Sequence, residues 1–157
     1  MSPEIAASQS GPSKAMTIVM IEDDEGHARL IEKNIRRAGV GSDLVAFTTG
    51  AEGVSYLLAA TEPTRGTPAT NVLLLLDLNL PDMNGIDILS RLKQGERTRR
   101  IPVVILTTTD DRDEIARCYE LGCNAYVTKP VAYDAFSHSI HQLALFFSIM
   151  QIPDMSW

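Results

Sequence analysis

The 157-residue sequence has only two cysteines, no excess of basic residues and no long apolar run. Cys118 and Cys123 lack the CxxC spacing of a zinc site or a redox dithiol, and no histidine lies near them. We therefore expect reduced, buried thiols and a cytoplasmic location. With 14 basic against 20 acidic residues, the charge balance argues against a broad nucleic-acid-binding face.

We expect neither a membrane span nor a signal peptide. No apolar run approaches the roughly 18 residues that a membrane span requires. Residues 1–15 contain serine, alanine and proline without the apolar centre of a signal peptide. We interpret residues 1–15 as a flexible tail, 16–148 as one globular domain and 149–157 as a C-terminal extension. A hydrophobic content of 45% is enough to build one core in a domain of this size.

Within this domain, short apolar runs alternate five times with amphipathic segments. The runs expected to form strands are 17–21, 44–47, 72–76, 102–106 and 125–127. The segments expected to form helices are 25–38, 50–60, 85–93, 111–121 and 132–150. Such alternation predicts an α/β fold in which parallel strands are joined by right-handed crossovers and covered by helices on both faces.

Asp77 is notable because it directly follows a run of four leucines, which is typical of a central strand buried on both faces. The proline, aspartate, asparagine and glycine that come next indicate a loop. Open α/β sheets hold their ligands at the carboxyl ends of the strands. Other predicted strand ends carry Glu22, Asp23, Thr107 and Lys129. We therefore expect these five side chains to meet at one edge of the sheet.

Together these side chains favour phosphoryl transfer. Carboxylate oxygens are suitable ligands for Mg²⁺. Thr107 can donate a hydrogen bond to a phosphoryl oxygen, and Lys129 can pair with its charge. Asp77 is then a candidate nucleophile that would form an aspartyl phosphate. Each residue alone would also fit a turn, a helix cap or a solvated helix start, and it is their joint placement that favours the functional interpretation.

The pattern resembles the receiver domains of two-component response regulators, over about residues 17–147. The similarity is carried by Ile21-Glu22-Asp23-Asp24, by Asp77 with Leu80-Pro81-Asp82-Met83-Asn84-Gly85, by Ile105-Leu106-Thr107-Thr108 and by Tyr126-Val127-Thr128-Lys129-Pro130. The resemblance implies a flavodoxin-like, doubly wound sheet of five parallel strands in the order 2-1-3-4-5, with five helices.

The resemblance also implies functional roles. Asp77 would accept a phosphoryl group from a histidine kinase, and Lys129 would contact that group. Thr107 and Tyr126 would move together as a switch after phosphorylation. The protein would then be a phosphoacceptor with self-catalysed phosphotransfer and autodephosphorylation, and not an enzyme.

A metal site is implied in the same way. Asp23, Asp77 and the backbone carbonyl of Asn79 would bind Mg²⁺, and Glu22 would reach the ion through water.

Haloacid-dehalogenase-type phosphatases are an alternative, because they also use a strand-end aspartate with Mg²⁺, threonine and lysine. They place a second aspartate two residues after the first, where this chain has Asn79. A flavodoxin-like nucleotide binder would need a glycine-rich loop after the first strand, where acidic residues stand here.

The last predicted helix carries two apolar stripes. The stripe expected to face the sheet contains Phe136, Ile140, Leu143, Phe147 and Met150. The second stripe contains Leu145, Phe146, Ile149 and Ile152. Because large exposed apolar patches are uncommon on monomers, the second stripe indicates a homodimer interface through Phe146 and Ile149. The alternatives are a C-terminal tail that covers this stripe, and a scaffold that dimerises regardless of phosphate.

Within the family, the chain is similar to small stand-alone regulators paired with phytochrome-type histidine kinases. The similarity lies in residues 98–108, in Asp77-Leu78-Asn79-Leu80-Pro81 and in the aromatic-apolar C-terminal extension ending near Ile152-Pro153. The expected partners are therefore a histidine kinase, with a bacteriophytochrome as the candidate, and a second copy of the chain. We expect neither a nucleic-acid nor a membrane partner.

Overall fold

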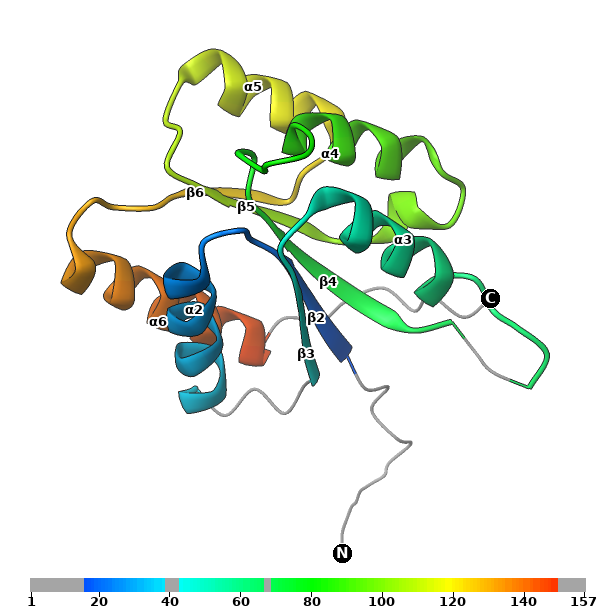
Figure 1. Cartoon of the computed structure of the whole chain (residues 1–157), viewed down its shortest axis with the longest axis horizontal. Helices are drawn as coiled ribbons and strands as arrows, with labels where there is room; N and C mark the ends of the chain where they lie inside the picture. The colour runs from blue at the N-terminus through cyan, green and yellow to red at the C-terminus, as the bar shows by residue number, and fades with distance from the viewer. Residues whose placement is uncertain (1–15, 39–42, 67–68, 150–157) are drawn as a thin grey trace, which may run out of the picture.

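A parallel β-sheet forms the centre of the molecule, and α-helices cover both of its faces (Figure 1). The computed structural model describes residues 16–38, 43–66 and 69–149. The strands within these ranges are β2 (Met16–Ile21), β3 (Asp43–Phe47), β4 (Asn71–Leu76), β5 (Val103–Thr107) and β6 (Ala125–Thr128). The helices are α2 (Glu25–Arg37), α3 (Gly50–Ala60), α4 (Gly85–Gln94), α5 (Arg112–Leu121) and α6 (Tyr133–Ile149).

The strand order is β3-β2-β4-β5-β6, and all neighbouring strands are parallel. Numbered along the chain, this is the expected order 2-1-3-4-5, so the predicted flavodoxin-like fold is confirmed. Most predicted boundaries agree within one residue, and Thr107 is the last residue of β5 rather than the first residue after it. A short 3-10 helix, η1 (Thr98–Arg100), was not predicted, because three residues are too few for a periodic pattern.

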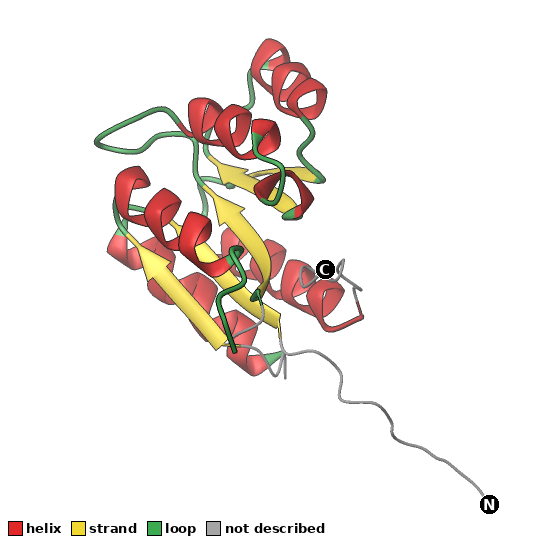
Figure 2. Cartoon of the chain, turned by 90° about the vertical axis from the view of Figure 1, so that its right-hand side faces the viewer, coloured by secondary structure: helices red, strands yellow, loops and turns green. Residues whose placement is uncertain are grey.

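The four leucines of β4 explain how the sheet is held between two layers of helices. All six residues of β4 are buried, and the strand pairs with β2 on one side and β5 on the other. Leu74 and Leu76 pack with residues of α3 and α4 on one face, and Leu73 and Leu75 pack with α2 and α6 on the other. Figure 2 shows the helices on both sides of the strands. Burial on both faces is the reason for an uninterrupted apolar run.

Both cysteines lie in the core on the α3 and α4 side. Cys118 and Cys123 are buried free thiols. Burial raises the pKa of the Cys123 thiol to about 11, so that the reactive thiolate is disfavoured at neutral pH. The prediction that both thiols are buried is confirmed.

Gly85 allows the chain to turn back tightly after β4. A Cβ atom at this position would lie 2.5 Å from the backbone oxygen of Asp77 and 2.7 Å from Cα of Leu78. The Gly85 amide also donates a hydrogen bond to the Leu78 carbonyl, at 2.8 Å. Because both close contacts are with backbone atoms, a larger residue would displace the segment that carries Asp77.

Helix α6 shows both predicted apolar stripes over its described part. Phe136, Ile140 and Phe147 are buried against β4, β5 and α2, which confirms that the first stripe faces the sheet. Leu145 and Phe146 are 46% and 51% exposed. Met150, Ile152 and the side chain of Ile149 lie outside the described residues. The proposed tail of residues 1–15 and the proposed extension of residues 149–157 stay predictions. Within the described ranges, no helix is both long and apolar enough to span a membrane.

Candidate functional site

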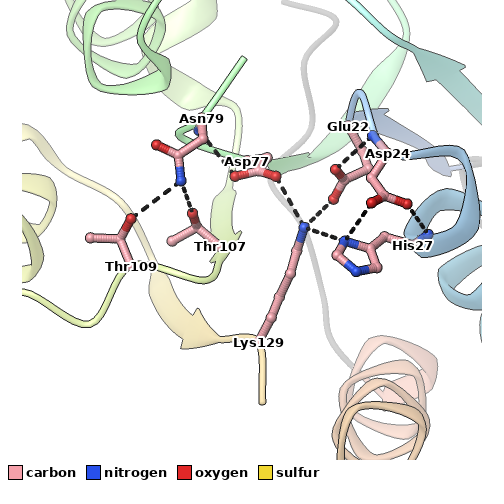
Figure 3. A network of polar contacts seen from close by, with 8 residues as sticks. All are labelled: Glu22, Asp24, His27, Asp77, Asn79, Thr107, Thr109 and Lys129. Atoms are coloured by element: carbon pink, nitrogen blue, oxygen red, sulfur yellow. Dashed lines mark hydrogen bonds and ion pairs between the residues drawn. The ribbon is translucent and has the colours of Figure 1, made fainter. Parts of the chain in front are cut away.

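The predicted site residues meet at the carboxyl edge of the sheet. Glu22 and Asp23 follow β2, Asp77 follows β4, Thr107 ends β5 and Lys129 follows β6. Because the strands are parallel, these ends lie at the same edge. Figure 3 shows Lys129 reaching toward Asp77 and Glu22, with Thr107 on the far side of Asp77.

Backbone hydrogen bonds extend the sheet into the site. The amide of Asp77 donates to the Ile21 carbonyl at 3.1 Å, and the amide of Glu22 donates to the Phe47 carbonyl at 2.9 Å. The amide of Lys129 donates to the Thr107 carbonyl at 2.7 Å. These bonds place the site side chains on the rigid sheet rather than on mobile loops.

Lys129 is the buried cation of the site, with 4% of its surface exposed. Its ammonium nitrogen lies 3.0 Å from Oδ2 of Asp77 and forms a short ion pair with Oε1 of Glu22. Its third contact is Nδ1 of His27, at 3.2 Å. Lys129 and the two carboxylates were predicted to meet, whereas His27 was missed.

The pKa values of the two buried carboxyl groups, Asp77 and Glu22, are shifted in opposite directions. Burial opposes the ionisation of Asp77, but the charge of Lys129 and a hydrogen bond from the Asn79 amide outweigh it and lower the Asp77 pKa. Burial raises the pKa of Glu22 to about 7 despite its contact with Lys129, and the nearby charge of Asp77 adds to this rise. Asp77 is therefore the carboxylate that stays ionised at neutral pH.

The acidic group can hold a metal ion. Glu22, Asp23 and Asp77 each offer a carboxylate oxygen, and these oxygens lie within 4.8 Å of one another. Asp23 is exposed, whereas the other two are buried, so that the group is open to solvent on one side. Hard oxygen donors at this spacing suit a divalent cation that keeps some of its waters.

Asn79 links the loop after Asp77 to the end of β5. Its side-chain amide donates to Oγ1 of Thr107 at 3.4 Å and to Oγ1 of Thr109 at 3.3 Å. The hydroxyl of Tyr126 donates to the Thr109 carbonyl at 2.7 Å. A chain of hydrogen bonds therefore runs from the loop after Asp77 to the predicted switch residue on β6. Thr107 and Tyr126, the two residues named for the switch, are thus linked through the side chain of Asn79 and through Thr109.

Asp82 is a second residue that the sequence analysis missed. Its carboxylate accepts hydrogen bonds from the amides of Gly50 and Ala51, at 2.8 and 2.9 Å, and so caps α3 from the loop after β4. A cavity of about 480 Å³, lined by Asp23 and residues 78–84, opens beside this loop. The cap holds one wall of the cavity in place, next to the acidic group.

Comparison with known proteins identifies relatives over most of the chain. A family model described as the response regulator receiver domain matches residues 18–141. The response regulator Rcp1 of Synechocystis sp. is 35% identical over 121 residues, which cover 77% of this chain and 80% of Rcp1. The crystal structure of a response regulator receiver domain from Rhodospirillum rubrum is 60% identical, with a TM-score of 0.82, and the match covers 90% of this chain and 99% of that one.

Two further similar crystal structures are of a metal-bound and of a phosphorylated response regulator. One is the Mn²⁺-bound form of Rcp1, with 26% identity, a TM-score of 0.77 and coverage of 87% of this chain and 98% of that one. The other is the phosphorylated cyanobacterial phytochrome response regulator RcpA, with 30% identity, a TM-score of 0.77 and coverage of 88% and 99%.

Proposed function

The chain belongs to the response regulator receiver family, and on this basis we propose that it accepts a phosphoryl group on Asp77. Receiver domains act with histidine kinases in two-component signalling and are phosphoacceptors rather than classical enzymes. The observation that carries the proposal is the contact of the buried Asp77 with Lys129, whose Nζ lies 3.0 Å from Oδ2 and lowers the pKa of the carboxyl group.

The proposed reaction is direct transfer from a phosphohistidine of the kinase. An ionised Asp77 oxygen can attack phosphorus without first losing a proton. As the new P–O bond forms, the P–N bond to the donor histidine breaks, and the electron pair of that bond stays on the departing imidazole. Lys129 and the hydroxyl of Thr107 would then pair with oxygens of the transferred group.

We propose Mg²⁺ as the ion of the acidic group. Asp23, Asp77 and the backbone carbonyl of Asn79 would hold it, and Glu22 would act through water. The close spacing of the carboxylate oxygens and the Mn²⁺-bound form of the relative Rcp1 support this choice. A bound divalent ion would offset the negative charge that gathers around the phosphorus during transfer.

We also propose that phosphorylation acts on the hydrogen-bond chain between Asn79 and Tyr126. The new group adds about −1.5 to −2 charges and three acceptor oxygens next to Thr107. A hydroxyl drawn toward those oxygens would move away from the Asn79 amide, which now lies 3.4 Å from it. Tyr126, whose hydroxyl now donates to the Thr109 carbonyl, could fill the space that Thr107 leaves. The face made by α5, β6 and α6 would then repack.

The proposed donor is a phytochrome-type histidine kinase, because the relative RcpA is a cyanobacterial phytochrome response regulator. When a bacteriophytochrome kinase labelled with radioactive phosphate is mixed with the chain and Mg²⁺, we expect the label to move to the chain. We expect an excess of EDTA to stop this transfer, because the metal is needed to offset charge. Gel autoradiography at successive times measures the transfer.

A histidine kinase of another sensory class serves as the control for specificity. Transfer from that kinase, without transfer from the bacteriophytochrome, would reject the light-sensing partner and keep the receiver function. If neither kinase nor acetyl phosphate labelled the chain, the receiver function itself would be rejected.

We further propose that the second stripe on α6 forms a homodimer interface through Phe146 and Ile149. Phe146 is half exposed although its neighbour Phe147 is buried, and a phenylalanine in this position gains free energy when a partner covers it. Phe146→Glu places a charge there and should convert dimers to monomers, as measured by light scattering.

Leu58→Glu is the matched control for the dimer, because Leu58 is a 43% exposed apolar residue on α3. We expect this variant to remain dimeric. If Phe146→Glu is still a dimer, the interface lies elsewhere on the chain. If the dimer depends on Phe146 but forms equally with Asp77→Asn, the result favours the phosphate-independent scaffold.

A further inference from the structure

We propose that His27 is a positioning residue that directs the Lys129 ammonium onto the phosphoryl site. This role rests on the proposed phosphorylation of Asp77. His27 stands in the first turn of α2, and its Nδ1 lies 3.2 Å from Nζ of Lys129. Figure 3 shows the imidazole beside the ammonium, on the side away from Asn79 and Thr107.

The three protons of the ammonium match its three partners. Lys129 contacts Asp77, Glu22 and His27, and an ammonium group has three donors and no acceptor. The contact with His27 is therefore a hydrogen bond only when Nδ1 carries the lone pair and the ring proton sits on Nε2. The four-carbon stem of a lysine is flexible, so that a third acceptor restricts where the nitrogen can lie.

His27 differs from the other two partners because it lies outside the acidic group. Glu22 and Asp77 both belong to the group whose oxygens lie within 4.8 Å of one another. A metal ion bound there would compete with Lys129 for these oxygens, and a phosphoryl group would compete with the carboxylates for the ammonium. The carboxylate oxygen that lies near Nδ1 of His27 is Oδ2 of Asp24, at 3.9 Å, and this oxygen does not belong to the acidic group. His27 can therefore keep its hydrogen bond while the ammonium shifts from Asp77 to the phosphoryl oxygens.

His27 is held by contacts of its backbone and of its ring. The backbone amide of His27 donates to Oδ1 of Asp24, the N-cap of α2, at 2.9 Å. Its ring meets the ring of Phe136 edge to face, with 5.1 Å between centroids and an interplanar angle of 78°. Phe136 is 4% exposed and belongs to the core between α2 and α6. The packing of α2 against α6 therefore fixes the position of the His27 ring, and with it the acceptor for Lys129.

Three substitutions separate a positioning role from a merely structural one. His27→Leu keeps an apolar body and removes the acceptor, so that it should lower the rate of phosphorylation by acetyl phosphate about tenfold, the effect of losing one hydrogen bond to a charged group. His27→Asn places an amide oxygen close to the position of Nδ1 and should restore the rate to within about twofold of wild type. His27→Gln carries its oxygen one bond further out and should remain slow.

Intact-protein mass spectrometry at saturating Mg²⁺ measures the rates, and urea denaturation of each variant checks that it is folded. The proposal is overturned if His27→Leu phosphorylates at the wild-type rate, or if a folded His27→Asn is as slow as His27→Leu. Labelling of the wild-type chain tests the proposed function separately, because that result does not depend on His27.

Discussion

Replacement of Asp77 by asparagine should abolish the labelling of the chain by acetyl phosphate and Mg²⁺. The amide has nearly the shape of the carboxylate and preserves the backbone bond from Asp77 to Ile21, at 3.1 Å. It lacks the charge that makes Asp77 a nucleophile. Because Asp77 is the ionised carboxylate that Lys129 contacts, we expect no other acidic group to take over.

Mass spectrometry of the intact chain, before and after mild base, is the appropriate measurement. Wild type should gain one phosphoryl group that is stable to acid and lost in base, and Asp77→Asn should gain none. Asp87→Asn, an exposed aspartate on α4, is the matched control and should label normally. Label retained by Asp77→Asn would assign the acceptor to another residue.

Replacement of Lys129 by methionine should destabilise the protein by about 3 kcal/mol near neutral pH, because removal of one partner leaves a buried charge uncompensated. Glu22 and Asp77 would lose the cation that lies between them, and both are buried. Glu22, whose pKa burial already raises to about 7, can take up a proton and limit the loss. Asp77 bears most of the cost, because Lys129 is what lowers its pKa against the effect of burial.

The sign of the pH dependence follows from Asp77. A carboxyl group with a lowered folded-state pKa stabilises the fold above its ordinary pKa, and this contribution is lost as the pH falls through the folded-state value. The difference in unfolding free energy between wild type and Lys129→Met should therefore shrink in acid. In Glu22 the raised pKa acts in the opposite direction, since stability falls as the pH rises from 4.5 to about 7.

Urea denaturation at about pH 7.5 and about pH 2.5 measures both effects, because the lowered pKa of Asp77 lies below 3.8. Lys33→Met, an exposed lysine of α2, is the control and should change stability by less than about 0.5 kcal/mol. A Lys129→Met variant as stable as wild type at the higher pH would show that the two carboxyl groups need no counter-charge. Added Mg²⁺ should recover part of the loss, because it binds the same carboxylates in the folded chain.

The sequence by itself determined the fold and the central residues of the site. Periodic apolar residues and glycine and proline at the turns are local signals, and they placed each strand and helix within a few residues. Parallel strands bring their carboxyl ends to one edge, so that Asp77, Glu22, Asp23, Thr107 and Lys129 could be grouped before any contact was known. On α6, the helical period alone distinguished the buried Phe147 from the exposed Phe146.

Only the tertiary structure decided which other side chains join that edge. His27 and Lys129 are 102 positions apart, and they meet because α2 packs against α6. Asp82 caps a helix that begins 32 positions earlier, and Asn79 reaches Thr109 from 30 positions away. No local pattern encodes these contacts, because each depends on how two separately formed elements pack together. The sequence therefore predicts which side chains follow each strand, such as Asp77, whereas the packing of the helices decides which other side chains, such as His27, contact them.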